Sequence, residues 1–301
     1  MTWFILSLIA ILFWSGSDLF SKLGSRPDDK YSHWKMVMAV GVVMGAHALF
    51  LIATGTPFSL SDIVTYLPAS AMYILSMILG YAGLRYIELS ISSPICNSSG
   101  ALVAILTLIT AGLGDMGALQ LIAITLVAGG VILLGVVEAT EDDELRAARQ
   151  EAGNRKYAKS FLALLLPILY CVLDAAGTFA DSLVLETLDE GSANVAYELT
   201  FLVAGLLAGG YVLFVKREKL TVRSEGPKYL GAVCETIGQF FYIYALADKA
   251  HVAMSAPIIA SYCAVSVLWS RLFLKEKLSW KHYAAIAITV AGIAIIGLLD
   301  P

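Results

Sequence analysis

The tetrapeptide SSPI at residues 92–95 recurs as SAPI at residues 255–258, and this repetition decides the fold. A shift of the chain by 163 residues also brings several other matches into register. The matched residues are Tyr66–Leu67 with Tyr229–Leu230, Tyr81–Ala82 with Tyr244–Ala245, Asp18 with Asp181, and Trp34 with Tyr197. Each match is weak alone, but their common order along the chain indicates two copies of one structural unit.

The composition is that of a membrane protein. Of the 301 residues, 58% are hydrophobic and 15% are charged, whereas soluble domains have about 45–50% and about 25%. A helix needs about 20 mainly apolar residues to cross a bilayer. Ten stretches meet this length: 3–23, 32–53, 64–86, 90–111, 118–138, 160–184, 193–215, 227–247, 251–272 and 280–299. The first stretch carries Asp18 and has no basic residue ahead of it, so we expect a retained span rather than a signal peptide.

The positive charges predict the orientation of these spans. Of the 20 Lys and Arg residues, all but Lys249 lie in or beside the odd-numbered connections. Connections rich in Lys and Arg stay in the cytoplasm. We therefore expect a multi-pass protein of the cell (inner) membrane. Its odd-numbered loops should be cytoplasmic, and both termini should lie on the outer side.

Five spans in each copy mean that the second copy enters the membrane upside down relative to the first. The sequence thus predicts an all-α membrane protein of ten transmembrane helices, arranged as two inverted five-helix repeats. Such repeats are typical of secondary transporters, which bind their solute near the midplane between the two halves. The predicted boundaries are a first repeat at 1–138, a cytosolic linker at 139–159 and a second repeat at 160–301.

The linker is the longest polar stretch of the chain, and two interpretations of it are open. Asp142 and Arg146 have the spacing of a surface ion pair, which favours a solvated cytosolic strap. The alternative is a regulatory or partner-binding segment.

Several motifs resemble one family of membrane proteins. The segment LFWSGSDLFSKLG at residues 12–24 resembles the first helix of the EamA-type, ten-helix branch of the drug/metabolite transporter (DMT) superfamily, in which a Trp precedes a Lys by eight residues. The residues that correspond here are Trp14 and Lys22. The starts of the fourth and ninth spans, at Pro94 and Pro257, and the segment FLKEKLSWKHY at 273–283 are similar to this family too.

The resemblance covers nearly the whole chain and implies two inverted EamA-like five-helix repeats around a central cavity. One difference matters here. Many relatives keep their termini in the cytoplasm, whereas the charge distribution of this chain predicts both termini outside. We expect the glycines of the fifth and tenth spans to seal the two halves together, as the resemblance also implies; they are Gly129, Gly135, Gly292 and Gly297. The GxxxG pairs Gly41/Gly45 and Gly205/Gly209 should allow close helix contact.

Polar side chains within the predicted spans mark the candidate site, because a charged group in lipid costs at least a few kcal/mol. Helical spacing places Glu235, Gln239 and Tyr242 on one face of the eighth span, and Tyr170 and Asp174 on one face of the sixth. These faces and polar residues of four other spans should share one space. The candidate substrate-binding residues are Glu235, Asp174, Gln239, Tyr242, Tyr73, Asn97, Tyr170, Trp14 and Tyr262.

This space is expected to be acidic and aromatic, since His47 is the only basic residue well inside a span. Carboxylates and aromatic rings bind ammonium groups, so we expect a cationic amine or quaternary ammonium compound as solute. Carboxyl groups shielded from water can also exchange protons, and the candidates for proton coupling are Glu235, Asp174 and Asp18. The main alternative is an exporter of amino acids or related metabolites without ion coupling.

Structural roles compete with these assignments. Glu235 could lie in a wet vestibule or pair with Lys228, and Asp18 could pair with Lys22. Asp174 could make a purely structural hydrogen bond. Two acids near the outer boundary, Asp181 and Glu198, are expected to be solvated, whereas His47 should bond to a neighbour. Pro94 and Pro257 are expected in the first turns of their helices, where a missing N–H is harmless.

Other classes of function lack support in the sequence. The chain has no metal-binding, nucleophilic or nucleotide-binding motif, so an intramembrane enzyme is disfavoured and no cofactor is expected. The four cysteines have no metal-ligand spacing and are expected to fill apolar space. A net charge of −4 gives no reason to expect nucleic acid. The expected partners are a small solute and the lipid bilayer, with a homodimer and a non-transporting receptor left open.

Overall fold

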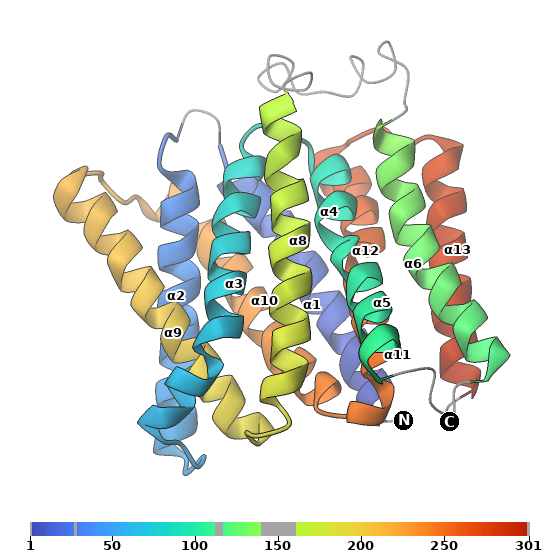
Figure 1. Ribbon diagram of the computed structural model, residues 1–301. Helices are drawn as coiled ribbons and strands as arrows, with labels where there is room; N and C mark the ends of the chain where they lie inside the picture. Colours follow the sequence, from blue (N-terminus) through green and yellow to red (C-terminus); the bar gives the residue numbers. More distant parts are fainter. Residues whose placement is uncertain (1, 27–28, 112–116, 140–160, 300–301) are drawn as a thin grey trace.

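The computed structural model describes residues 2–26, 29–111, 117–139 and 161–299, which are nearly all helical and contain no strand. Figure 1 shows the helices as one bundle. The first half contains α1 (Thr2–Gly24), α2 (Ser32–Ala53), α3 (Leu60–Leu84), α4 (Leu89–Asn97), α5 (Ser99–Ala111) and α6 (Ala118–Ala139). The second half contains α8 (Phe161–Val184), α9 (Glu190–Gly210), η1 (Tyr211–Val215), α10 (Val222–Leu246), η2 (Lys249–His251), α11 (Val252–Ala260), α12 (Tyr262–Trp269), η3 (Ser270–Leu274) and α13 (Trp280–Leu299).

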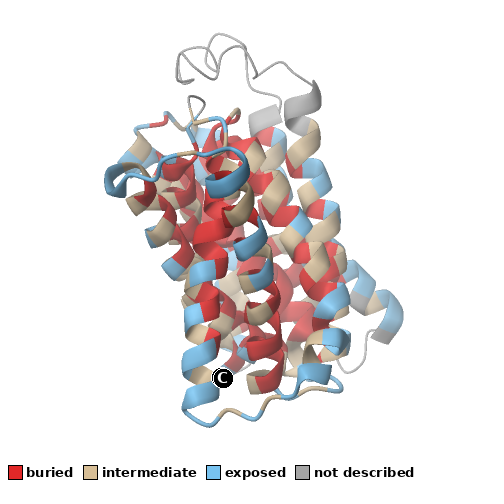
Figure 2. Ribbon diagram, turned by 90° about the vertical axis from the view of Figure 1, so that its left-hand side faces the viewer, coloured by how far each residue is buried: buried red, intermediate tan, exposed pale blue. Residues whose placement is uncertain are grey.

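The described helices form a membrane-spanning bundle. Nine of the described segments are long and apolar enough to cross a bilayer. Large apolar side chains such as Leu49, Phe50 and Leu207 are exposed on the outside of the bundle, where lipid would cover them. In Figure 2 the buried residues fill the interior, and the exposed ones lie outside or at the ends.

The eighth predicted span, 227–247, corresponds to α10, and the start of this helix was placed wrongly. This helix begins at Val222 rather than at residue 227, so its first turns include Arg223, Glu225 and Lys228. Hydropathy cannot detect a helix that continues through charged residues, and here the charges are tolerated because they pair with one another. Lys228 is 1% exposed, and its Nζ lies 3.1 Å from a carboxylate oxygen of Glu225.

The helices pack as an inverted repeat. α1 packs against α10 and α8 packs against α3, and these two interfaces are equivalent under the 163-residue shift. α2 packs against α9 and α6 against α13, so each of these helices contacts its own counterpart. α1 begins and α13 ends at one end of the bundle, whereas α8 begins at the other (Figure 1). The boundaries of the two repeats stay a prediction, because most of the predicted linker, 139–159, lies outside the described residues.

The fourth and ninth spans are each broken into two helices at equivalent positions. Pro94 is the sixth residue of α4 and Pro257 the sixth of α11, so the expectation that they lie in first turns is wrong. Each break comes four residues later, at Ser98 and Ser261. The Ser98 hydroxyl donates to the Pro94 carbonyl at 3.0 Å, and such back-bonding bends helices.

Close contacts between glycines and facing helices set the spacing of the bundle. A Cβ at Gly41 would lie 2.3 Å from the Phe201 carbonyl oxygen, so α2 and α9 approach at the predicted GxxxG pairs. A Cβ at Gly292 would lie 2.7 Å from Val127 across the α6–α13 contact. Gly129 does not take part in this contact, contrary to the sequence prediction, and its neighbour Gly130 does instead.

This difference provides a matched pair of variants. We expect Gly130→Ala to destabilise the protein by about 1–3 kcal/mol, the usual cost of overpacking. Its Cβ would lie 2.2 Å from the Thr289 hydroxyl oxygen and 2.9 Å from the Thr289 backbone nitrogen. The Cβ of Gly129→Ala would have no atom of the described residues within 4 Å, so this change should leave stability unchanged or slightly higher. Thermal unfolding in detergent checks this, and equal effects of the two changes would contradict the packing.

Buried charges join α2, α10 and the segment before α2 at the end of the bundle where α1 ends. Lys35 Nζ lies 3.1 Å from Asp29 and 3.4 Å from Glu218. Lys228 Nζ lies 3.5 Å from Asp29, in addition to its contact with Glu225. The two lysines share Asp29 and Glu225, since Lys35 Nζ also lies 4.0 Å from Glu225, and together they connect both halves of the chain.

Candidate functional site

A central cavity of about 930 Å³, including the open space at its mouth, lies between the two halves. Helices α1, α3, α4, α5, α8, α9, α10, α11 and α12 all contribute to its wall. Each candidate residue predicted from the sequence lies on this wall: Trp14, Asp18, Tyr73, Asn97, Tyr170, Asp174, Glu235, Gln239, Tyr242 and Tyr262.

Asp18 of α1 is held at the cavity by two serines from the broken spans. The hydroxyls of Ser93 (α4) and Ser266 (α12) donate to one of its carboxylate oxygens at 2.5 and 2.7 Å. Lys22, one turn further along α1, donates to the backbone carbonyls of Leu84 and Ile87. The position of Asp18 is thus fixed by the serines of both repeats.

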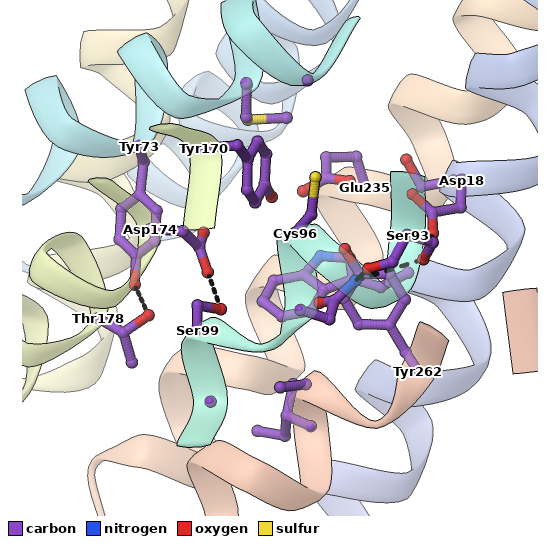
Figure 3. A pocket seen from close by; sticks show the side chains of 18 of the residues that line it. Asp18, Tyr73, Ser93, Cys96, Ser99, Tyr170, Asp174, Thr178, Glu235 and Tyr262 are labelled. Carbon is purple, nitrogen blue, oxygen red and sulfur yellow. Dashed lines mark hydrogen bonds between the residues drawn. The ribbon is translucent and has the colours of Figure 1, made fainter. Parts of the chain in front are cut away.

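Asp174 lies on the opposite wall, at the middle of α8. Ser99 at the start of α5 donates a hydrogen bond of 2.7 Å to its carboxylate (Figure 3). The Tyr170 hydroxyl lies close to the same carboxylate. A Cβ at Gly80 would lie 2.8 Å from the Tyr170 ring, so this glycine of α3 leaves the room that the ring occupies.

Glu235 of α10 completes the acidic part of the wall. Its carboxylate lies beside the Ser17 hydroxyl and interacts electrostatically with Asp18 and Asp174. Lys228 pairs with Glu225 and Asp29 at the end of the bundle, so the predicted alternative of a Glu235–Lys228 pair is not seen. Three carboxylates from three helices therefore face one cavity, each with some exposed surface.

Aromatic side chains form the rest of the wall. The Trp14 ring lies 5.0 Å from the Tyr242 ring and 5.6 Å from the Tyr262 ring, between centroids. The hydroxyls of Tyr73 and Tyr242 are 2.6 Å apart, and Tyr73 also donates to Thr178 at 2.9 Å. Among the described residues that line the cavity there is no Lys, Arg or His.

Some donors on this wall have no hydrogen-bond partner among the described residues. The indole nitrogen of Trp14, the amide nitrogen of Gln239 and the hydroxyl of Tyr81 are buried and make no hydrogen bond with described residues. All three residues line the cavity. A buried donor without a partner costs about 1–3 kcal/mol, so these groups can gain free energy from a solute that carries an acceptor.

Sequence reasoning missed the small residues that hold the acids in place. Ser93 and Ser99 bond to carboxylates that face the cavity, but serine is too common in helices to be selected by pattern. Ser266, which bonds to Asp18, does lie on the polar face expected for the ninth span. One pattern could have identified Ser93 and Ser99, because both lie close in sequence to Asn97, which was already a candidate site residue.

Two acids were predicted wrongly as solvated. Asp181 and Glu198 are both 0% exposed. Glu198 accepts from His47 Nδ1 at 2.7 Å, which is the neighbour bond expected for this histidine. Asp181 accepts from the Tyr66 hydroxyl, in a layer of side chains next to the cavity. The position of a residue along its helix does not determine its exposure, because it does not show which neighbouring helix covers the side chain.

The fold is also seen in solved structures. One of them, described only as a crystal structure of a protein, superposes with a TM-score of 0.65 over 98% of this chain and 96% of the other, at 16% sequence identity. This identity supports a common fold and no more. A comparison with curated protein sequences found no match.

Residues 161–298, which comprise the second set of five spans, match the EamA-like transporter family. This match confirms the resemblance read from the sequence, and it applies to the half of the chain that contributes Asp174 and Glu235. The chain is thus a multi-pass membrane protein whose second half is similar to the EamA-like transporter family, a branch of the drug/metabolite transporter superfamily whose members move small solutes.

Proposed function

We propose that this protein moves a cationic amine or quaternary ammonium compound across the cell membrane by alternating access. The observation that carries this proposal is the cavity wall, on which Asp18, Asp174 and Glu235 meet without a basic residue from the described part of the chain. The charge distribution supports cytoplasmic odd-numbered connections, with both termini outside.

The chemistry of the wall favours a positive solute. An ammonium group near these carboxylates gains charge-assisted hydrogen bonds, or direct ionic contact if it is fully methylated. The rings of Trp14, Tyr242 and Tyr262 add cation–π contacts worth about 0.5–2 kcal/mol each. An anionic solute would meet three like charges in a partly desolvated space.

The same wall supports proton coupling. Like charges close together destabilise one another, and either a proton or a cationic solute relieves this repulsion. The two ligands would then compete for Glu235, Asp174 and Asp18, and this competition is the physical basis of an exchange of solute for protons.

A second candidate solute is an amino acid. It would use the carboxylates for its ammonium group and the free donors of Trp14, Gln239 and Tyr81 for its own carboxylate. This alternative needs no proton coupling, because a zwitterion brings no net charge into the cavity.

A thermal-shift experiment on purified protein separates these solutes, since a ligand of the native state raises the unfolding temperature. Choline is compared with its neutral isostere 3,3-dimethylbutan-1-ol, and phenethylamine with phenylalanine and 3-phenylpropanoate. We expect choline and phenethylamine to stabilise the protein, and the isostere and the anion to have no effect. Stabilisation by phenylalanine alone would favour the second candidate, and equal stabilisation by choline and its isostere would reject the cationic solute.

Flux into proteoliposomes under an imposed pH gradient tests the coupling. The stabilising probe, radiolabelled, is followed in the wild type and in Asp174→Asn and Glu235→Gln. We expect both variants to transport more slowly and with a weaker dependence on pH. Normal transport with the wild-type pH dependence in both variants would reject the acidic site.

A further inference from the structure

A sealed layer of side chains lies between the cavity and the end of the bundle where α1 begins. Asp181 of α8 is 0% exposed, and one of its carboxylate oxygens accepts from the Tyr66 hydroxyl of α3. The other oxygen has no hydrogen-bond partner among the described residues. Asp181 follows Asp174 by two helical turns, about 10 Å, toward the end of α8.

Tyrosines from three helices complete this layer. The Tyr197 ring of α9 makes edge contacts with the rings of Tyr66 and Tyr73, at 5.8 and 5.7 Å between centroids. The hydroxyl of Tyr242 from α10 lies near the Asp181 carboxyl. No Lys, Arg or His from the described residues pairs with Asp181. The mechanism proposed above uses Asp174 and gives Asp181 no role.

The repeat supplies a counterpart for this acid–tyrosine pair. A shift of 163 residues places Asp18 on Asp181 and Tyr66 on Tyr229. The counterpart of the α8–α3 interface is the α1–α10 interface, to which Asp18 and Tyr229 belong. The sequence therefore repeats the pair and not only the acid.

The two pairs differ in this structure. Tyr66 is fully buried and bonded to Asp181, which closes its end of the bundle. Asp18 lines the cavity and accepts from Ser93 and Ser266 instead of Tyr229, which is half-buried near the opposite end. The cavity reaches toward that end, where Ser21 and Leu84 line it. One pair is thus closed while the other is open.

We propose that Tyr66 and Asp181 form a latch that closes one side of the cavity, and that Tyr229 and Asp18 form the equivalent latch in the state that opens to the other side. Two inverted halves of similar structure can exchange their conformations at a small cost in free energy. After this exchange Asp181 faces the cavity in place of Asp18, so the cavity keeps its acidic wall toward either side. The proposal rests on the transporter function above, because it needs a second state.

The latch predicts opposite effects from two equivalent substitutions. Tyr66→Phe removes the bond that stabilises the present state, and Tyr229→Phe removes the bond that stabilises the other. A hydrogen bond to a charged group contributes enough to change such an equilibrium about tenfold. We expect Tyr66→Phe to raise the population of the second state about tenfold, and Tyr229→Phe to lower it about tenfold.

A reporter cysteine measures this population. Leu185, just after α8, is 6% exposed and packs in the core next to the latch, so Leu185→Cys should react with a maleimide only when that side opens. Cys96, Cys171, Cys234 and Cys263 are replaced by alanine. Tyr66→Phe should speed labelling about tenfold and Tyr229→Phe should slow it about tenfold. Tyr244→Phe, an exposed tyrosine of α10, serves as the control and should not change the rate.

The Tyr229→Phe variant distinguishes the latch from a local effect. Faster labelling in Tyr66→Phe could come from local loosening, but Tyr229 lies at the other end of the bundle, where only a shared equilibrium connects it to Leu185. An unchanged or faster rate in Tyr229→Phe overturns the latch, also if Tyr66→Phe fails to fold. The assay uses neither solute nor proton gradient, so opposite effects together with a failed ammonium screen would keep the latch and reject the proposed solute.

Discussion

Glu235→Gln is expected to lower the affinity for choline about a hundredfold and to leave the protein folded. Loss of one partner from a desolvated charge pair costs about 2–5 kcal/mol, and a factor of one hundred is about 2.7 kcal/mol. The amide keeps the shape of the side chain and its contact with Ser17, but it removes the charge. Titration of the variant with choline, followed by intrinsic tryptophan fluorescence or calorimetry, measures the change.

The stability of the ligand-free variant separates a binding role from a structural role. In the empty cavity Glu235 repels Asp18 and Asp174, so its neutralisation should leave the unfolding temperature unchanged or raise it. Glu186→Gln, which removes an exposed carboxylate between α8 and α9, is the matched control and should bind choline normally. A structural Glu235 would show the reverse pattern, with lower stability and unchanged affinity.

Helical periodicity predicted the composition of the cavity wall well. Glu235, Gln239 and Tyr242 share a face because their spacing is that of one helix side, and no tertiary information is needed for this. Polar residues avoid lipid, so faces of this kind on several spans must point inward, and the structure brings all of them to one cavity. Their role in binding stays a prediction.

The sequence could not show which acids are covered. Asp18 and Asp181 occupy equivalent positions in the two repeats, yet one lines the cavity and the other is sealed beneath Tyr66. A transporter in a single state must break the symmetry of its own sequence, since only one side is open. Equivalent residues then have different exposure, and no pattern in the chain records which one is open.

The charged start of α10 was missed for a different reason. Hydropathy scores each residue alone, whereas Lys228 and Glu225 are tolerated inside the bundle as partners. The breaks after Pro94 and Pro257 were missed similarly, because each lies at a serine whose hydroxyl bonds back to the preceding turn. Ser98 donates to the Pro94 carbonyl and Ser261 to the Ile258 carbonyl.

Lys228→Met should have the largest effect on stability, a loss of about 3–5 kcal/mol, because it leaves buried acids without one of their two cations. Lys228 is 1% exposed and contacts Glu225 and Asp29 at 3.1 and 3.5 Å. Methionine fills a similar volume, so a cavity contributes little to the expected loss. Thermal unfolding in detergent should show a much lower transition temperature. Lys249→Met, at an exposed lysine, is the control and should leave it unchanged.

A second substitution identifies charge as the cause. In Lys228→Met/Glu225→Gln one of the two acids that lost Lys228 is neutralised, while Lys35 still pairs with Asp29 and Glu218. The double variant should therefore be more stable than Lys228→Met alone, although Glu225→Gln by itself should be destabilising. The effect of Glu225→Gln on stability thus changes sign between the wild type and the Lys228→Met background. Such a change is expected only if the two side chains interact directly. If Glu225→Gln costs the same in both backgrounds, the cluster does not act as an ion network, and Lys228 stabilises the bundle through the packing of its aliphatic chain.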